Sequence, residues 1–419
     1  MATDLALLGG KPVRTKPWPT WPVYGLAEEQ ALLRVLHSGK WGKTEGTETA
    51  TFEKRFADYI GVKHAIAVVN GTVSLRIALL AAGIEAGDEV IVPPYTFLAT
   101  ATAVVEANAV PVFVDINRET FNIDPAQIEK AITSRTRAII PVHVGGLACD
   151  MDAIMSIAKK HNLTVIEDAA HAHGSEYRGK RVGAIGHFGS FSFQSSKNLN
   201  SGEGGIITTN DDALADTCRS IHNCGRIKGG KWYEHHVMSS NYRLSEFQSA
   251  ILNAQFDRLD EQTNRRDANG RYLDSKLSKI PGITPQRRDA SATRNAYHLY
   301  LFRYDATTFG IPRERFVQAM EAEGIPVSSG YVIPLYKQPL FANKNFGPYT
   351  GAISSRAECD YANLNLPNCE AICAGEGAWL YQSVLLGDRS DMDDIVNAAT
   401  KIYAARDVLS GTGTSPVLT

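Results

Sequence analysis

The sequence lacks the features that mark several large classes of protein. No stretch approaches the ~20 uninterrupted apolar residues of a membrane span, and the opening MATDLALLGGKPVR has acid and glycine where a signal peptide is basic and then apolar. The 43 basic and 45 acidic residues nearly balance, so no positive excess is available for nucleic acid or an anionic membrane. We therefore expect a cytoplasmic protein with neither a nucleic acid nor a membrane as partner.

Cysteine is scarce, and no metal-binding pattern accompanies it. The six cysteines are scattered without CxxC spacing, which argues against both a disulfide framework and a zinc ribbon. The pairs His171-x-His173 and His235-His236 belong to no set of histidines and carboxylates with a recognisable ligand spacing. We therefore expect no metal.

The common nucleotide-binding motifs are also missing. No G-x-G-x-x-G occurs, and Gly174–Arg181 (GSEYRGKR) departs from the P-loop because Arg181 stands where magnesium needs a hydroxyl. Nucleotide hydrolysis and the usual dinucleotide fingerprint are therefore excluded.

What the chain does contain is an alternation of short β-branched runs and helical patterns over residues 64–210. This alternation predicts an α/β fold with a mostly parallel sheet between helices. Asp124 and Asp150 precede two of the helical patterns and are expected to cap them.

The organisation changes after about residue 250. One long polar helix is expected over residues 254–280, followed by a strand in AYHLYLFRYD and a helix in RERFVQAMEAEG. We predict an N-terminal arm and large domain at 1–274 and a smaller C-terminal α+β domain at 275–419. The first forty or so residues are expected to wrap an edge of the large domain.

Lys197 is the most unusual charged residue of the chain. It follows a short aromatic strand in FSFQSSK and precedes a glycine-rich turn and the strand 205–209. Loops at strand ends are where α/β folds bind ligands. A lysine that only solubilises a turn remains the alternative for this segment alone.

Three other segments could complete a binding site. The turn Asn70-Gly71-Thr72 can bind a phosphate with the amides of a helix start, or be only a capped turn. Asp168 ends an apolar strand and can pair with a cationic ring nitrogen, or cap the next turn. Phe97 can stack on a flat ring, or be a core aromatic. A phosphate cradle, an aromatic face, an acid and an imine-forming lysine are together the parts that hold pyridoxal phosphate.

In this order along the chain, the parts resemble the aspartate-aminotransferase fold type (fold type I) of pyridoxal-phosphate enzymes. Within it the chain resembles the DegT/DnrJ/EryC1/StrS family of sugar aminotransferases over roughly residues 20 to 400. The motifs that carry the resemblance are EVIVPPYTFLATATAV, PVFVDI, PVHVGG, VIEDAAHAHGS, FSFQSSKNLNSGEGG and SNYRLSEFQ.

The resemblance implies a role for each site residue. Lys197 would bind the cofactor covalently and then act as the general base, while Asp168 would keep the ring nitrogen protonated. The remaining cofactor contacts would come from Gly71, Thr72, Val73 and Ser192 at the phosphate, Phe97 and His171 at the ring, and Asn241 reaching the partner subunit's site. A homodimer is thus implied.

The implied reaction moves an amino group from L-glutamate or L-glutamine to a keto-sugar or keto-cyclitol. Arg243 is the candidate for the donor carboxylate, although a structural surface pair is an equal reading, and Tyr331 is a second candidate for substrate binding. The tryptophan-rich start and the ending WLYQSVLL favour the subgroup that acts on keto-cyclitols in aminoglycoside assembly.

Three alternatives remain for the function. One is a lyase similar to the 3-amino-5-hydroxybenzoate synthases, one is an aminotransferase of nucleotide-linked keto-sugars, and one is a non-catalytic regulator. The related 3-dehydratases are excluded because they have histidine at the position of Lys197.

Overall fold

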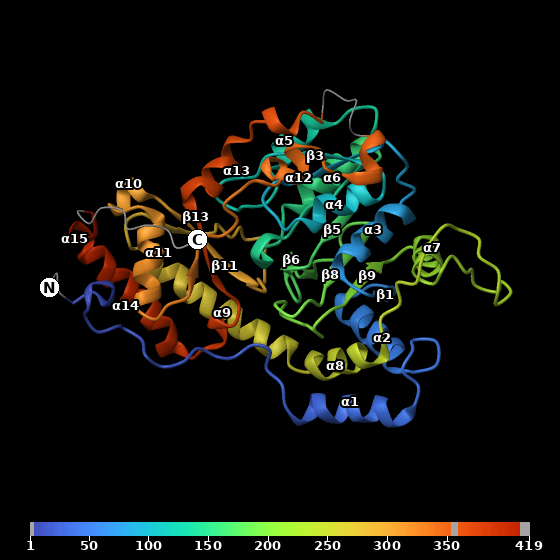
Figure 1. The fold of residues 1–419 in the computed structure, drawn as a ribbon, viewed down its shortest axis with the longest axis horizontal. Helices are drawn as coiled ribbons and strands as arrows, with labels where there is room; N and C mark the ends of the chain where they lie inside the picture. The colour runs from blue at the N-terminus through green and yellow to red at the C-terminus, as the bar shows by residue number, and fades with distance from the viewer. Residues whose placement is uncertain (1–3, 353–358, 411–419) are drawn as a thin grey trace.

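The computed structural model describes residues 4–352 and 359–410, and its larger sheet has seven strands (Figure 1). The strand order is β1-β9-β8-β5-β4-β2-β3; β9 is antiparallel to both neighbours and the other four pairs are parallel. The prediction of a mostly parallel sheet is confirmed. The strands are β1 (His64–Val68), β2 (Glu89–Val92), β3 (Val110–Phe113), β4 (Thr136–Ile139), β5 (Thr164–Asp168), β8 (Phe188–Ser192) and β9 (Gly205–Thr209).

Helices cover both faces of this sheet, as predicted. Val90 and Val92 of β2 pack into one apolar core with α3, α4 and α7, whereas Ile91 between them packs into a second core with α2, α5, α6 and α8. This alternation follows from the two-residue period of a strand. These helices are α2 (Glu48–Ile60), α3 (Gly71–Ala81), α4 (Ala99–Glu106), α5 (Pro125–Ala131), α6 (Met151–His161), α7 (Asp212–His222) and α8 (Glu246–Phe256).

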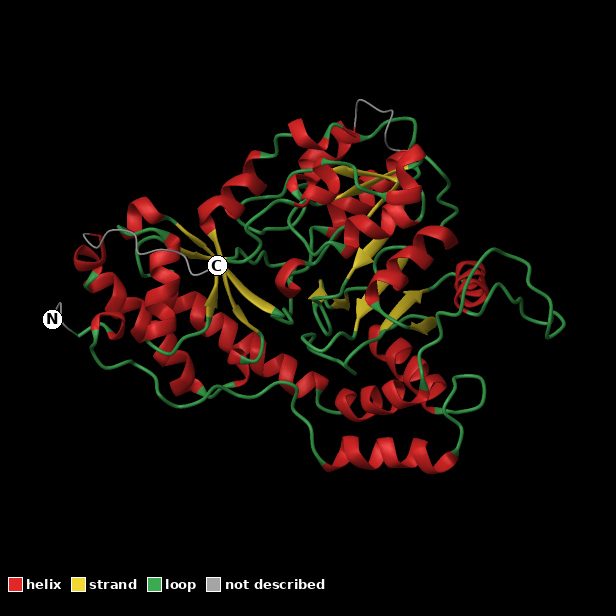
Figure 2. Cartoon of the chain, in the orientation of Figure 1, coloured by secondary structure: helices red, strands yellow, loops and turns green. Residues whose placement is uncertain are grey.

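A second, antiparallel sheet lies in the C-terminal part, with order β10-β11-β13-β12, and helices surround both sheets (Figure 2). The expected strand and helix are present as β11 and α11. The strands of this sheet are β10 (Ile283–Pro285), β11 (Leu299–Tyr304), β12 (Val327–Ser328) and β13 (Gly377–Tyr381). The helices of the C-terminal part are α10 (Ala306–Phe309), α11 (Arg313–Ala322), α12 (Pro339–Ala342), α13 (Pro367–Ala371), α14 (Arg389–Ala404) and α15 (Arg406–Ser410). A separate two-stranded sheet consists of β6 (Glu176–Tyr177) and β7 (Lys180–Arg181).

The domain boundary near residue 275 stays a prediction. Residues after it contribute to both halves of the molecule, because Tyr336 and Phe341 pack into the core of the large sheet. Phe302 of β11 and Phe316 of α11 instead belong to a separate core around the antiparallel sheet.

The expectation of one helix over residues 254–280 is wrong. The chain forms α8, which ends at Phe256, and then α9 (Leu259–Leu277). The break places Asp260 and Glu261 in the first turn of α9, where acidic side chains interact favourably with the helix dipole.

The N-terminal segment contacts the large domain, which it was expected to wrap, and also the C-terminal sheet and its helices. Leu5 belongs to the core of the antiparallel sheet, and the buried Arg14 forms ion pairs with Asp391 (2.7 Å) and Asp394 (2.8 Å) of α14. The later part, with α1 (Leu26–Ser38), lies beside α8 (Figure 1). The buried guanidinium and its two carboxylates hold the early part of the segment on the C-terminal sheet's helices.

The described residues contain neither a membrane-spanning helix nor a metal-binding cluster. Across residues 4–352 and 359–410, none of the helices combines the length and the apolar content that a membrane span requires. Within the same ranges, no three or more histidine, cysteine, aspartate or glutamate residues are grouped as a metal site would need. All six cysteines are free, and five of them are buried.

Candidate active site

A cavity of about 750 Å³ lies at the carboxyl ends of β5 and β8. Ligands of α/β folds bind at this edge of the sheet. Trp21 of the N-terminal segment and Trp379 of β13 form part of its wall, so the N-terminal segment and the C-terminal sheet both contribute to it. The cavity brings together most of the residues that the sequence predicted, namely Gly71, Thr72, Phe97, Asp168, His171, Ser192, Lys197 and Tyr331.

Lys197 follows β8 in a tight loop, in which its backbone N–H donates to the Gln194 carbonyl at 2.8 Å. Within the described residues its ammonium group has no hydrogen bond or ion pair. Burial lowers the pKa of Lys197 to about 8, although attraction to Asp168 opposes the shift. A larger fraction of neutral amine is therefore present near neutral pH than for an ordinary lysine, and a neutral amine is the nucleophilic form.

Asp168 ends β5 and is almost fully buried. Thr100 Oγ1 donates to its Oδ2 at 2.8 Å, and the Ala170 N–H donates to its Oδ1 at 3.2 Å. Burial nevertheless raises the pKa of Asp168, because these contacts only partly offset the loss of water. The carboxylate thus lacks a close cationic partner among the described residues, and a protonated ring nitrogen would supply one.

The first turn of α3 lies against the end of β8. A Cβ added to Gly71 would lie 2.7 Å from the Ser192 Cβ, so only glycine permits this approach. The amides that begin a helix have no acceptor within it, and Gly71 and Thr72 both line the cavity. The Val73 N–H instead donates to the Asn70 side chain at 2.8 Å. Gly71, Thr72 and Ser192 therefore form the corner suited to a phosphate.

Aromatic side chains also line the cavity. Phe97 is 60% exposed there, which is unusual for phenylalanine and leaves its ring free to stack on a flat ligand. Tyr331 packs edge-on against Trp379 with 5.1 Å between ring centres. Tyr331 is thus held on the wall.

Several cavity residues were not found by sequence reasoning. Thr100 binds Asp168, His298 packs its ring 4.3 Å from that of His171, and Gln382 lies on the wall. Thr100 lies within the motif EVIVPPYTFLATATAV already noted, so it could have been named. His298 and Gln382 come from the C-terminal part, and only the tertiary fold brings them to the site.

Trp21 is fixed on the cavity wall by a buried arginine. Its indole N–H donates to the Ser195 carbonyl at 3.0 Å, and the Arg266 guanidinium lies 5.2 Å from its ring centre. Arg266 on α9 also donates to the Gln382 side chain and has no ion pair among the described residues. Burial lowers the pKa of Arg266 to about 9. Arg266 thereby joins the N-terminal and C-terminal parts of the wall.

Three predicted residues, Val73, Asn241 and Arg243, are not among those that line this cavity of the single protomer. Asn241 accepts a hydrogen bond from the Arg243 N–H at 3.2 Å, and the Arg243 guanidinium donates to Asn223 Oδ1 at 2.7 Å. Their roles toward cofactor and donor stay predictions.

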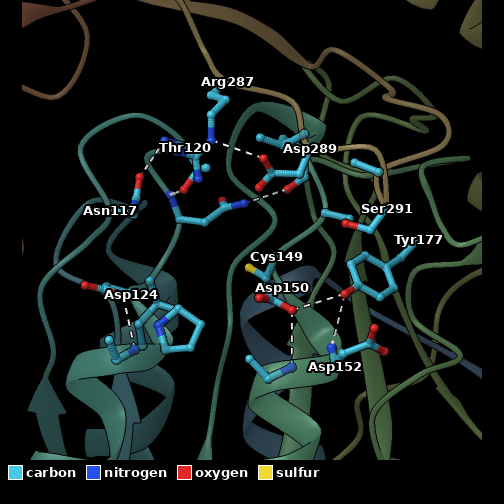
Figure 3. Close-up of a pocket in the computed structure, with 18 of the residues that line it drawn as sticks. Asn117, Thr120, Asp124, Cys149, Asp150, Asp152, Tyr177, Arg287, Asp289 and Ser291 are labelled. Atoms are coloured by element: carbon cyan, nitrogen blue, oxygen red, sulfur yellow. Dashed lines mark hydrogen bonds and ion pairs between the residues drawn. The ribbon is translucent and has the colours of Figure 1, made fainter.

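A second hollow, of about 640 Å³, lies at the starts of α5 and α6 (Figure 3). Asp124 and Asp150 cap these helices as predicted, by accepting from the Ala126 and Ala153 amides. Asp150 also accepts from the Tyr177 hydroxyl. These polar groups are engaged in local structure.

The 750 Å³ cavity therefore contains an amine of lowered pKa, a buried acid without a cation, a phosphate corner and an exposed ring on a mostly parallel α/β sheet. These features define a pyridoxal-phosphate-dependent enzyme of fold type I, and the residues present fit that cofactor. The DegT/DnrJ/EryC1/StrS aminotransferase family matches residues 24–376. The chain belongs to this family, so it is a pyridoxal-phosphate-dependent aminotransferase.

Known proteins resemble the chain over its full length. It is 40% identical to the L-glutamine:2-deoxy-scyllo-inosose aminotransferase of Micromonospora echinospora, covering 98% of this chain and 100% of that one. A protein of the same name from Streptomyces paromomycinus is 37% identical with the same coverage. The crystal structure of 3-amino-5-hydroxybenzoic acid synthase superposes with a TM-score of 0.84 at 35% identity, covering 94% of this chain and 100% of that one.

Proposed function

We propose that this aminotransferase moves the amino group of L-glutamine to a keto-cyclitol. Two similar proteins that span the full chain are named for L-glutamine and 2-deoxy-scyllo-inosose. Their names support both the donor and the class of acceptor. A cytoplasmic location, expected from the sequence, belongs to the same proposal.

The scarcity of cationic side chains in the cavity is the observation that favours a keto-cyclitol as the acceptor. Among the described residues of one protomer that line it, Lys197 is the only lysine or arginine, and the Arg243 that the second copy would add is assigned to the donor carboxylate. A nucleotide-linked sugar brings a diphosphate, which proteins bind with cationic side chains. A keto-cyclitol is uncharged and needs only neutral hydrogen-bonding groups, such as those of Gln194, Ser196 and Gln382 on the wall. The cavity therefore favours the cyclitol over the nucleotide sugar.

Each of the main cavity residues has a separate role in amino transfer. Bound pyridoxal phosphate supplies an electron sink for the carbanion formed at the donor's α-carbon. Lys197 Nζ takes the α-proton of the donor and, with the acceptor bound, delivers a proton to the carbon that gains the nitrogen. Asp168 stabilises the protonated ring nitrogen, and the first turn of α3 orients the phosphate.

We also propose a homodimer with shared sites. The loop between α7 and α8 projects from the body of the protomer (Figure 1). Trp232, Tyr233 and Met238 in this loop are 78%, 77% and 96% exposed, which favours burial against another surface. Asn241 and Arg243 lie at the base of this loop. In the proposal, Asn241 reaches the phosphate corner of the second copy and Arg243 binds the donor carboxylate.

The two half-reactions test the proposed function separately. L-Glutamine should bleach the visible band of the holoenzyme, and 2-deoxy-scyllo-inosose or scyllo-inosose should then restore it and yield an amino-cyclitol. Restoration only by a 3- or 4-keto nucleotide sugar would refute the choice of acceptor. Formation of a dehydrated aromatic product without amine exchange would instead support the lyase.

A further inference from the structure

Two neutral histidines, His171 and His298, lie side by side on the cavity wall. Nδ1 of one ring faces a hydrogen-bond donor, and Nδ1 of the other faces an acceptor. The rings of His171 and His298 are 4.3 Å apart between centres and tilted by 38°. Both residues line the cavity that contains Lys197. Their contacts determine which nitrogen of each ring carries the hydrogen.

In His298 the hydrogen is on Nδ1. The Asn198 Nδ2 donates to the Ala296 carbonyl at 2.8 Å, so the Asn198 amide must present its oxygen to the histidine. His298 Nδ1 lies 3.2 Å from that oxygen and is therefore the donor. A neutral imidazole carries one hydrogen, so Nε2 of His298 has a lone pair and acts as an acceptor.

In His171 the arrangement is the reverse. The Gly145 N–H donates to His171 Nδ1 at 3.3 Å, so Nδ1 is an acceptor and Nε2 carries the hydrogen. The wall thus presents one donor nitrogen and one acceptor nitrogen from adjacent rings.

Both Nε2 atoms are available to a ligand. His173, a third histidine nearby, has both ring nitrogens buried without a partner, whereas the Nε2 atoms of His171 and His298 are not buried in this way. Within the described residues neither of these two atoms has a protein partner. Since both residues line the cavity, their Nε2 atoms open onto it.

The imidazole of His298 stays neutral because of its burial and of the groups near it. Burial lowers its pKa well below the ordinary range, and repulsion from His171, Lys197, His173 and Arg266 lowers it further. Protonation would place a second positive charge beside Lys197. The lone pair therefore persists through the neutral pH range.

We propose that Nε2 of His298 accepts a hydrogen bond from a ring hydroxyl of the keto-cyclitol, close to the carbon that receives the amine. This inference rests on the proposed function. The carboxylate on the donor's reacting carbon has no hydrogen to offer, and the donor's side-chain amide lies three bonds away from that carbon. The cyclitol has at least one hydroxyl-bearing ring carbon directly next to its carbonyl. His298 is thus a substrate-binding residue that selects a hydroxylated acceptor.

The test uses His298→Asn, which can keep the inner hydrogen bond to Asn198 but removes the outer acceptor. His298→Gln can return an amide oxygen to the position of Nε2. The matched control is His187→Asn, because His187 precedes β8 at the end of the strand far from the cavity and accepts from the Val165 N–H. Each holoenzyme is measured in both half-reactions, with keto-cyclitols that each lack one hydroxyl.

His298→Asn should lower kcat/KM for the intact acceptor about 10-fold or more, while bleaching by L-glutamine changes less than about 2-fold. The loss should vanish for the one analogue that lacks the contacted hydroxyl, and His298→Gln should recover part of it. An equal loss in both half-reactions, or the same loss for every analogue, would overturn the inference. His187→Asn should match the wild type.

A spectroscopic measurement tests the same atom without activity. In holoenzyme with ¹⁵N-labelled histidine, His298 should show a protonated Nδ1 and His171 a protonated Nε2; the opposite tautomer at His298 would refute the proposal. If wild-type enzyme aminates no keto-cyclitol, the proposed function fails and this inference fails with it. If it does so and His298→Asn is equally active, only the inference fails.

Discussion

Two hollows in the described part of this protein are similar in volume but different in chemistry. The cavity around Lys197 measures about 750 Å³ and the hollow at the starts of α5 and α6 about 640 Å³. In the first, burial lowers the pKa of Lys197 and raises that of Asp168, which moves both groups toward their neutral forms. In the second, Arg178 pairs with Asp152 at 2.7 Å, and its pKa is raised by Tyr177 and Asp152.

The difference shows what separates a binding site from a surface depression. Helix caps and exposed ion pairs already satisfy the polar groups of the second hollow, so a ligand would gain little there. The first cavity contains groups whose partners are missing, and a ligand with a phosphate and a cationic ring nitrogen would supply them. Unsatisfied chemistry, more than volume, identifies the active site.

The largest expected effect comes from Lys197→Ala. Without the amine, the covalent bond to the cofactor and the moving base are both lost, so kcat should fall by at least about 10³-fold. The visible band of the holoenzyme should disappear. The matched control is Arg178→Ala, which removes a cation from the other hollow. Unchanged activity in Lys197→Ala would refute the assignment of the active site to the larger cavity.

Asp168→Asn should have the next largest effect. It leaves the ring nitrogen without a charged partner, and losing one member of a buried charged pair costs about 2–5 kcal/mol, so kcat should fall by about 10²-fold or more. Asp150→Asn makes the same chemical change in the second hollow, where asparagine caps a helix about as well as aspartate. A similar loss of kcat in both variants would contradict the assignment of the site.

The pH dependence of cofactor uptake sharpens the account of Lys197. Only the neutral amine reacts, so the rate at which apoenzyme binds pyridoxal phosphate should rise about tenfold per pH unit and level off above pH about 8. An ordinary lysine would keep the rate rising to about pH 10.4. Stopped-flow absorbance measures the rate, and a rise that continues through pH 10 would show that burial does not shift this amine.

A smaller effect is expected at Trp21. Trp21→Phe removes the N–H that donates to the Ser195 carbonyl but keeps an aromatic ring, so KM for the acceptor should rise about 2–10-fold. Trp18→Phe is the control, because Trp18 also donates to a backbone carbonyl, of Gly324, but does not line the cavity. Equal KM values for the two variants would remove Trp21 from the site.

The smallest effect is expected in the second hollow. Arg178 and Asp152 are both mostly exposed, and exposed ion pairs contribute little to stability. Arg178→Ala should therefore leave kcat, KM and the melting temperature unchanged within error. A drop in kcat/KM would show that the second hollow has a function.

Much of the site was predictable because it is local in sequence. Gly71 and Lys197 follow the strands β1 and β8, and Asp168 is the last residue of β5. The ends of such strands meet at one edge of a parallel sheet. The caps Asp124 and Asp150 were also predictable, since a cap depends on only a few neighbouring residues.

The remainder depends on contacts between distant segments. His298 is positioned by its hydrogen bond to Asn198, one hundred positions earlier in the chain. The ring of Trp21 packs against the guanidinium of Arg266 on α9. The break between α8 and α9 was missed because the polar pattern continues through it. Such features depend on tertiary packing, and the periodic pattern of a helix or strand carries no information about contacts between distant segments.

The central claim is that Lys197, in the larger cavity, is the residue that binds pyridoxal phosphate. Borohydride reduction of the holoenzyme followed by tryptic mapping tests it most directly, because reduction makes the bond permanent and blocks cleavage after the modified lysine. The account predicts one cofactor per chain, on the peptide spanning residues 182–219. A cofactor found on any other lysine, or retained in Lys197→Ala, would contradict it.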